Sequence, residues 1–230
     1  MTVLSSGAAV VEHADRGPLS TDELAAVIGR DIPAGSYVNL GIGQPTKIAD
    51  HLPVGANGQP DVILHTENGM LGMGPAAAGD DIDPDLTNAG KVPVTELPGA
   101  SYFHHADSFA MMRGGHLDVC VLGAYQVSAR GDLANWHTGK PDAIPAVGGA
   151  MDLAIGAKAL YVMMTLFGPD GRSKLVPVCT YPLTAPRCVS RLYTDQATFH
   201  LAGGVVTVTE TYGTTVAELQ RRSGVDLATG

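Results

Sequence analysis

Residues 61–75 read DVILHTENGMLGMGP, and this stretch organises the rest of the chain. Residues 62–64 (VIL) form a short apolar run without a breaker, which predicts a strand. The strand should end at residues 67–69 (ENG), because Asn and Gly tolerate positive φ and together mark a turn. Two further glycines and a proline follow within residues 70–75, so we expect a glycine-rich loop there.

Glu67 is the carboxylate at the junction of this strand and the loop. In open α/β sheets, ligands bind beyond the carboxyl ends of the strands. Glycine lets a ligand approach the backbone, so the N–H groups of Asn68 and Gly69 are expected to face an anion. The alternative is an ordinary polar strand end, since the glycine spacing G-x-x-G-x-G is not the dinucleotide-binding pattern and no helix pattern follows it.

Two more glycine pairs are candidates for anion binding. Residues 37–40 predict a strand that runs into Gly41 and Gly43, followed by a helix over residues 47–52. This order predicts either an anion cradle of backbone N–H groups or a tight turn in which glycine permits close packing. Gly148-Gly149 precedes a second short helix and is a candidate site for an anion or a thioester oxygen.

Composition limits the class of protein. The chain has 230 residues, 45% hydrophobic and 16% charged, which is enough for one substantial core. Its formal net charge of −9 argues against nucleic acid and an anionic membrane surface as partners. The sequence has three cysteines without a C-x-x-C pair and no signal-peptide pattern, so we expect a reduced, cytoplasmic setting. The most apolar run, residues 159–168, is about half of the ~20 residues that a membrane span needs.

The order of the predicted elements indicates one domain over residues 20–225. Residues 1–19 are small and polar without periodicity, so we expect a mobile N-terminal segment, and residues 226–230 form a C-terminal tail. Ser20 and Glu23 have the spacing of a capping box and predict the start of the first helix. A β-hairpin and a final helix are predicted near the C-terminus, over residues 199–209 and 216–222.

Two groups of polar residues are candidates for a metal site. His104 and His105 are adjacent, and neighbours on a strand point to opposite faces, so they are not expected to share an ion. Residues 80–85 contain four aspartates, but their spacing matches no calcium loop and predicts a solvated acidic loop. We therefore expect no metal.

Five strings of the sequence identify a family resemblance. They are residues 66–69 (TENG), 88–91 (NAGK), 112–116 (MRGGH), 131–136 (GDLANW) and 148–153 (GGAMDL). Over residues 20–225 the chain resembles the β subunits of family I CoA-transferases, with Thr66 where that family usually has Ser. The resemblance implies an α/β fold with a three-layer, open, mostly parallel sheet flanked by helices, of the CoA-transferase and NagB-RpiA type, with a C-terminal β-hairpin and helix.

The resemblance also implies a chemistry and a partner. In the family, the glutamate of the ENG turn attacks an acyl-CoA thioester and becomes a glutamyl-CoA thioester, and this role falls on Glu67. No cofactor is implied, because CoA is a substrate. The glycine-rich CoA-binding segment of the family's α subunit does not occur in this sequence, which implies an α-subunit partner in a heterodimer or a heterotetramer.

Three strings point to one branch of the family. Residues 104–107 (HHAD), 135–137 (NWH) and 175–177 (LVP) resemble the branch that transfers CoA from succinyl-CoA to 3-oxoadipate. This acceptor carries a second carboxylate, which must meet donors or positive charge in a closed site. His137 is the first candidate for that contact, and the further candidates are His104, His105 and Arg113. Departures from the family pattern leave the acceptor open, at residues 164–168 and 185–187.

Two other functions stay open on the same residues. Relatives with this fold hydrate a CoA-linked substrate or open its ring with a glutamate as general base, and Glu67 fits that role too. A non-catalytic CoA-binding subunit is the second alternative. A covalent glutamyl-CoA adduct distinguishes the transferase from both.

Overall fold

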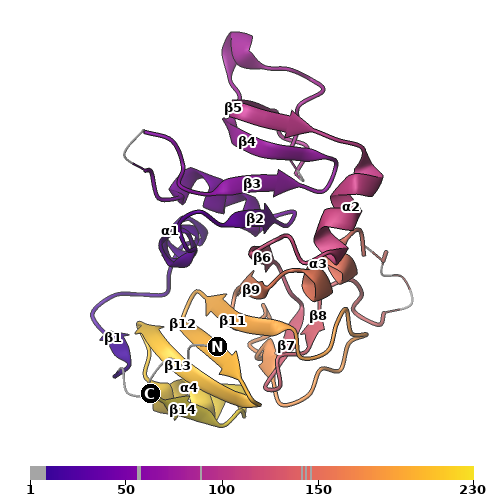
Figure 1. Cartoon of the computed structure of the whole chain (residues 1–230). Coiled ribbons are helices and arrows are strands. Elements are labelled where there is room, and N and C mark those ends of the chain that lie inside the picture. Colours follow the sequence, from indigo (N-terminus) through magenta and orange to yellow (C-terminus); the bar gives the residue numbers. More distant parts are fainter. Residues whose placement is uncertain (1–8, 56–57, 89, 141, 143, 146) are drawn as a thin grey trace.

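A computed structural model of the chain describes residues 9–55, 58–88, 90–140, 142, 144–145 and 147–230. Within these residues the main sheet has eleven strands, and five of them run parallel in the order β11-β9-β6-β2-β3 (Figure 1). Their bounds are β2 Tyr37–Leu40, β3 Ile63–Thr66, β6 Val119–Leu122, β9 Ala159–Met164 and β11 Val189–Thr194. The parallel order brings the carboxyl ends of β2, β3 and β6 to one edge.

Alternate residues of these strands face two separate cores. In β6, Cys120 and Leu122 pack into one core, whereas Val119 and Val121 pack into the other. Helices α1 and η1 cover the second core, and helices α2 and α3 cover the first. Their bounds are α1 Thr21–Asp31, η1 Gln44–His51, α2 His105–Arg113 and α3 Ala150–Gly156. The predicted layered, mostly parallel sheet flanked by helices is therefore confirmed.

The first two helices differ in how well the sequence predicted them. The capping box of α1 is confirmed, because the Ser20 hydroxyl accepts a hydrogen bond from the Glu23 N–H at 3.3 Å and the Ser20 N–H donates to the Glu23 carboxylate at 2.8 Å. The second helix, predicted over residues 47–52, is a 3₁₀ helix over Gln44–His51, so it begins three residues earlier than predicted. Its first turn is tight because the Thr46 N–H donates to the Gly43 carbonyl, three residues back.

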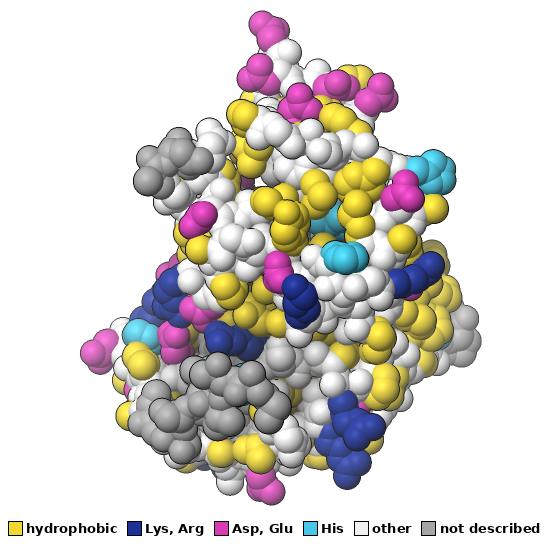
Figure 2. Space-filling view, viewed as in Figure 1, with side chains coloured by type: hydrophobic (Ala, Val, Ile, Leu, Met, Phe, Trp, Pro, Cys, Tyr) yellow, Lys and Arg dark blue, Asp and Glu magenta, His cyan; other side chains and the backbone are white. Residues whose placement is uncertain are grey.

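The prediction of a glycine-rich loop after Glu67 is wrong, because this segment is strand β4 (Met70–Ala76). It pairs antiparallel with β3 and with β5 (Val94–Tyr102), and two register shifts interrupt its pairing with β5. Glycines at such irregularities are compatible with a strand, which the sequence pattern did not reveal. The two strands form an arm that ends in η2 (Gly79–Asp81), where acidic side chains gather in Figure 2.

The segment with the paired histidines is a helix, not a strand. His104 is the N-cap of α2, and its Nδ1 accepts a hydrogen bond from the Ala106 N–H at 3.1 Å, while His105 begins the helix. The argument from opposite strand faces therefore does not apply to this pair. In the part of the chain that the structure describes, no three His, Cys, Asp or Glu side chains are grouped to hold a metal ion.

A small three-stranded sheet lies beside the main one and carries the loop with Trp136. Its strands are β7 (Gln126–Ser128), β8 (Leu133–Ala134) and β10 (Leu175–Val176). The Trp136 Nε1–H donates to the Leu183 carbonyl at 3.2 Å, which ties this loop to the segment after β10.

The C-terminal hairpin and helix are confirmed as β12 (Ala197–Ala202), β13 (Val205–Tyr212) and α4 (Val216–Ser223). Both predicted terminal segments, however, contribute strands to the sheet. Strand β1 (Val11–His13) pairs with one part of β13, and β14 (Leu227–Thr229) pairs with another part of it. Residues 1–8 of the predicted mobile segment lie outside the described residues.

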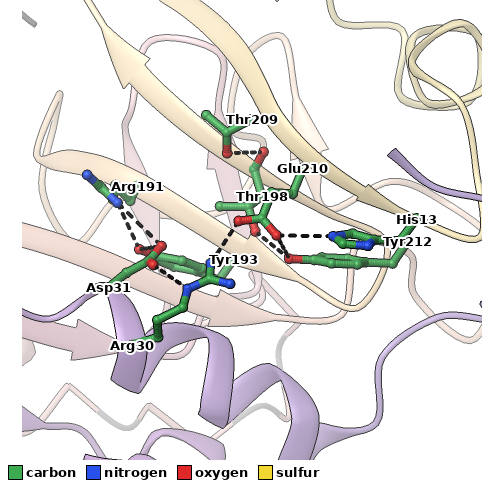
Figure 3. Close-up of polar contacts among 9 residues, drawn as sticks. All are labelled: His13, Arg30, Asp31, Arg191, Tyr193, Thr198, Thr209, Glu210 and Tyr212. Carbon is green, nitrogen blue, oxygen red and sulfur yellow. Dashed lines mark hydrogen bonds and ion pairs between the residues drawn. The ribbon is translucent and has the colours of Figure 1, made fainter. Parts of the chain in front are cut away.

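A group of charged side chains joins α1 to the C-terminal strands, and we call it the charged cluster (Figure 3). The Arg30 guanidinium donates to Glu210 at 2.7 Å and to Asp31 at 2.9 Å. Asp31 also accepts the Tyr193 hydroxyl at 3.1 Å and lies 3.5 Å from the Arg191 guanidinium. The charged cluster consists of Arg30, Asp31, Arg191, Tyr193 and Glu210.

The helices that the structure describes were compared with the length and apolar character of a membrane span, and none of them has both.

Candidate active site

A pocket of about 620 Å³ opens at the carboxyl ends of β2, β3 and β6. Residues 39–42, 64–68 and 122–125 line it from these three strands and the turns that follow them. The start of α3 and the turn before it also line the pocket, with residues 147–150. The pocket therefore lies at the edge where open α/β sheets bind ligands.

Glu67 and Gly149 both line this pocket and lie against each other. Glu67 is half-buried, and a Cβ placed on Gly149 would overlap the Glu67 Oε2 atom. Glycine at 149 thus gives the carboxylate its place against the backbone. No side chain or backbone group among the described residues donates a hydrogen bond to the Glu67 carboxylate. The glycine-turn N–H groups do not stabilise this anion as expected, and its oxygens are open to a ligand.

Two of the predicted backbone donors are used inside the protein. The Gly69 N–H donates to the Thr66 carbonyl at 3.1 Å, and the Gly41 N–H donates to the Val121 carbonyl at 2.9 Å. Neither N–H is available to a ligand in this structure, contrary to the prediction. Both positions need glycine for close approach, since a Cβ on Gly69 would overlap the Phe103 carbonyl oxygen and one on Gly41 would lie 2.8 Å from a Leu122 methyl carbon.

The remaining predicted donors are divided between the pocket and its surroundings. Asn68 lines the pocket, whereas Gly43, at a φ of 90°, caps η1 outside the lining. Gly148 and Gly149 both line the pocket, and Gly149 lies against the Glu67 carboxylate. Their N–H groups donate to no other described residue, which makes them the predicted donors that the structure keeps together with the carboxylate.

Of the four candidates for the acceptor carboxylate, the structure brings only His105 to the pocket. His104 caps α2 through its Nδ1. The Arg113 side chain is bound to Asp152 at 2.7 Å, and this hydrogen bond raises its pKa. The Nδ1 of His137 accepts the Gly139 N–H at 3.0 Å, and its ring is not part of the described pocket lining.

Sequence reasoning missed Lys91, which is the single Lys or Arg among the described lining residues. Its backbone has a φ of 62°, and its N–H donates to the Asn88 carbonyl at 3.0 Å, so a tight turn presents the side chain beside the pocket. Ala89, within the same NAGK string, lies outside the described residues. The string was visible in the sequence, but nothing in it indicated that the lysine would reach Glu67's pocket.

Sequence reasoning also missed a group of neutral side chains beneath Glu67, formed by Asn39, His65 and Ser108, which we call the histidine cluster. His65 is only 2% exposed. Its Nδ1 lies 3.0 Å from the Asn39 Nδ2, and its Nε2 lies 3.0 Å from the Ser108 Oγ. Burial lowers the pKa of His65 from 6.5 to about 4, so the ring is neutral near pH 7. A histidine in an apolar strand was the available signal, but its partners are distant in sequence.

Comparison with known proteins identifies the class. Residues 21–217 match the family model described as coenzyme A transferase, and the chain belongs to this family. Within it, the chain is 54% identical over 210 residues to the B subunit of 3-oxoadipate CoA-transferase from Acinetobacter baylyi, covering 91% of this chain and 95% of that protein. It is 56% identical over 210 residues to the protein of the same name from Pseudomonas putida, covering 91% and 96%. The predicted family and the enzyme class of CoA-transferase are confirmed.

A solved structure agrees with the fold. The acyl-CoA transferase YdiF from Escherichia coli O157:H7 superposes with a TM-score of 0.66 at 19% identity. The match covers 92% of this chain and 42% of YdiF, so this chain spans less than half of that protein. At this identity the likeness shows the fold alone.

Proposed function

We propose that this chain is the β subunit of a CoA-transferase that moves CoA from succinyl-CoA to 3-oxoadipate or a similar 3-oxo acid, with Glu67 as nucleophile. The observation that carries the proposal is the Glu67 carboxylate, which lies at the carboxyl end of β3, against Gly149, without a hydrogen-bond partner among the described residues. The names of the relatives at 54% and 56% identity support the choice of substrates.

The first half of the reaction moves CoA onto the protein. A Glu67 oxygen attacks the thioester carbonyl of succinyl-CoA, and collapse of the tetrahedral intermediate gives a mixed anhydride and CoA thiolate. The thiolate then attacks the Glu67 acyl carbon of the anhydride, which releases succinate and leaves a glutamyl-CoA thioester. A carboxylate nucleophile suits this exchange because either side of the anhydride can accept the thiolate.

The second half returns CoA to the acceptor. A carboxylate oxygen of the 3-oxo acid attacks the glutamyl thioester, giving a second anhydride and CoA thiolate. Attack of the thiolate on the acceptor's acyl carbon forms the new acyl-CoA and regenerates the Glu67 carboxylate. Each step develops negative charge on an oxygen, and the N–H groups of Gly148 and Gly149 are our candidate donors to it.

Lys91 is our candidate for binding the carboxylate of the acids. The charge is needed because each acid must bring a carboxylate close to Glu67, which is itself an anion. Lys91, Asn68 and Asn88 lie together in the pocket lining and supply one positive charge and two amides. A dicarboxylic acceptor would place one carboxylate at Glu67 and have the second within reach of these side chains.

We also propose that an α subunit completes the site. Apolar side chains lie exposed at the pocket and on α3: Ile42, in the pocket lining, is 71% exposed, and Ile155 on α3 is 66% exposed. Tyr125 and Val147 belong to the pocket lining and are exposed as well. Apolar surface of this kind beside a site is typical of an interface with another protein.

The test is intact-mass analysis of the chain, co-expressed with its α subunit, after incubation with succinyl-CoA. We expect a CoA adduct that maps to Glu67, no adduct in Glu67→Ala, and loss of transfer in that variant with folding retained. Asp107→Ala is the matched control, because this exposed carboxylate lies on the neighbouring α2 and outside the described pocket lining. An adduct on another residue, or transfer by Glu67→Ala, would contradict the proposal.

A further inference from the structure

The histidine cluster lies immediately before the Glu67 turn and connects three elements. Asn39 comes from β2, His65 from β3 and Ser108 from α2. Asn39 and His65 also line the pocket, so the cluster forms part of its floor. All three side chains are buried and none carries a formal charge in the neutral state of the ring.

The hydrogen bonds define one tautomer of His65. The Asn39 side chain presents its N–H₂ group to Nδ1, so Nδ1 must accept and the ring proton must lie on Nε2. The Nε2–H then donates to the Ser108 Oγ, whose own proton is directed to the Thr66 carbonyl at 3.4 Å. Protonation of Nδ1 would place two donors face to face, and burial already lowers the pKa of this ring.

The two side chains that contact the His65 ring also hold the backbone that leads into Glu67. The Asn39 Nδ2 donates to the His65 carbonyl at 3.2 Å, and Ser108 donates to the Thr66 carbonyl. These are the carbonyl groups of the two residues directly before Glu67. The His65 ring lies in a stacked arrangement with Phe103, at 6.1 Å between centroids, and the Phe103 N–H donates to the Gly69 carbonyl on the far side of the turn at 3.0 Å.

We propose that His65, as the neutral Nε2–H tautomer, is a positioning residue that aims the Glu67 carboxylate at the thioester through the Asn39–His65–Ser108 hydrogen bonds. The inference rests on the proposed role of Glu67 as nucleophile. Because Glu67 itself has no hydrogen-bond partner among the described residues, its direction depends on the backbone at residues 65–66 and on the contact with Gly149. A displacement of about 1 Å at a reacting group lowers rates by about a hundredfold.

The test compares His65→Phe, His65→Gln and Ser108→Ala in the complex with the α subunit. The measurement is the rate constant of glutamyl-CoA formation at saturating succinyl-CoA, by rapid quench and intact mass, together with KM. We expect His65→Phe to form the adduct about thirtyfold more slowly with KM within about twofold, because an aromatic ring remains but its two nitrogen contacts, which hold the Asn39 and Ser108 side chains at the His65 and Thr66 carbonyls, do not. His65→Gln should recover most of the rate, since its amide can donate to Ser108.

Ser108→Ala gives an independent measurement if His65→Phe folds poorly. It should slow adduct formation about as much as His65→Phe, and the double variant should lose little more, because both remove the same chain of bonds. Tyr193→Phe, in the charged cluster, is the matched control for loss of a buried polar contact and should react at the wild-type rate.

Each outcome supports or overturns a particular claim. Wild-type adduct formation in both His65→Phe and Ser108→Ala overturns the positioning role, as does equal loss in His65→Phe and His65→Gln. If wild-type protein forms no adduct on Glu67, the proposed function fails, whatever the His65 variants do.

Discussion

The histidine cluster and the charged cluster are both hydrogen-bonded networks, but one is neutral and the other is built from ion pairs. The histidine cluster joins β2, β3 and α2 beneath the pocket. The charged cluster joins the end of α1 to β11 and β13, in the other half of the sheet (Figure 3). Its two arginines and two carboxylates balance one another, and Arg30 and Glu210 are 180 residues apart.

The difference indicates a division of tasks. Ion pairs between distant segments hold β11 and β13 to the first helix, in a place without the proposed chemistry. A positively charged side chain in the histidine cluster would instead pair with the Glu67 carboxylate and reduce its availability for attack on the thioester. A network without formal charge fixes the backbone and leaves the carboxylate free, which suits a nucleophile.

The largest expected effect concerns the contact between Gly149 and the Glu67 carboxylate, in the pocket beside the histidine cluster. Gly149→Ala should lower kcat by at least about a hundredfold, because the new Cβ would overlap Glu67 Oε2 and turn the carboxylate away. Stability should change little, since Gly149 has a φ of −86°, which alanine adopts readily. The measurements are steady-state kinetics and urea unfolding.

Gly148→Ala is the control for this variant. A Cβ at this neighbouring position meets no atom within 4 Å, although its φ of 45° makes alanine mildly strained there. It should therefore lose some stability and keep most of its activity. Gly149→Ala with wild-type turnover would show that the contact with Glu67 has no part in catalysis.

The second prediction concerns the charged cluster. Asp31→Ala should destabilise the chain by about 2–3 kcal/mol and leave kcat within twofold, because Arg191 and the Tyr193 hydroxyl lose a shared acceptor. Asp22→Ala, which removes exposed ion pairs of α1 with Lys47 and His51, should cost less than about 0.5 kcal/mol. If the two variants unfold at the same urea concentration, the charged cluster does not stabilise the fold more than an exposed ion pair does.

The third prediction uses pH to separate the clusters. The pKa of His65 is about 4 in the folded chain, against 6.5 for an ordinary histidine, so the unfolded chain binds more protons between these values. The stability that the neutral ring contributes is present above pH 6.5 and is lost as pH falls toward 4. Between pH 7 and pH 5 the wild type should lose about 2 kcal/mol more than His65→Phe. Parallel pH profiles of unfolding for the two proteins would argue against a buried neutral ring.

The smallest expected effect concerns acceptor binding at the rim of the pocket. Lys91→Met should raise KM for the acid substrates about tenfold, because it removes the single Lys or Arg of the described lining. His137→Met should change kcat/KM for 3-oxoadipate less than about threefold, since the ring is bonded to its own loop through Gly139. A tenfold loss in His137→Met, specific to 3-oxoadipate, would favour His137 over Lys91 as the contact for the acceptor.

Several features of the fold followed directly from local sequence patterns. The capping box at Ser20, the strand over residues 37–40 and the hairpin predicted over residues 199–209 show in local sequence patterns, and the structure has all three. Strand β4 was missed because its glycines have the pattern of a loop, and only pairing with β3 and β5 makes it a strand.

The candidate site was harder to predict for the same reason. Placing Glu67 at the end of a strand required only the turn signal at Asn68 and Gly69. The partner of each backbone N–H, by contrast, depends on the neighbouring strands. The Gly41 N–H donates to the carbonyl of Val121, which is eighty residues away in sequence. The bonds of His65 to Asn39 and Ser108 likewise depend on β2 and α2 packing against β3, which no local pattern contains.

One consequence of the terminal strands concerns self-association. Strand β1 pairs with residues 210–212 of β13 and β14 pairs with residues 206–208, so the two ends of the domain together cover the side of β13 that faces away from β12. An uncovered edge strand offers its backbone to other chains and promotes aggregation. Fusion tags or truncations that pull either short strand away would therefore uncover half of this edge, and insoluble protein would follow from a change far from the pocket.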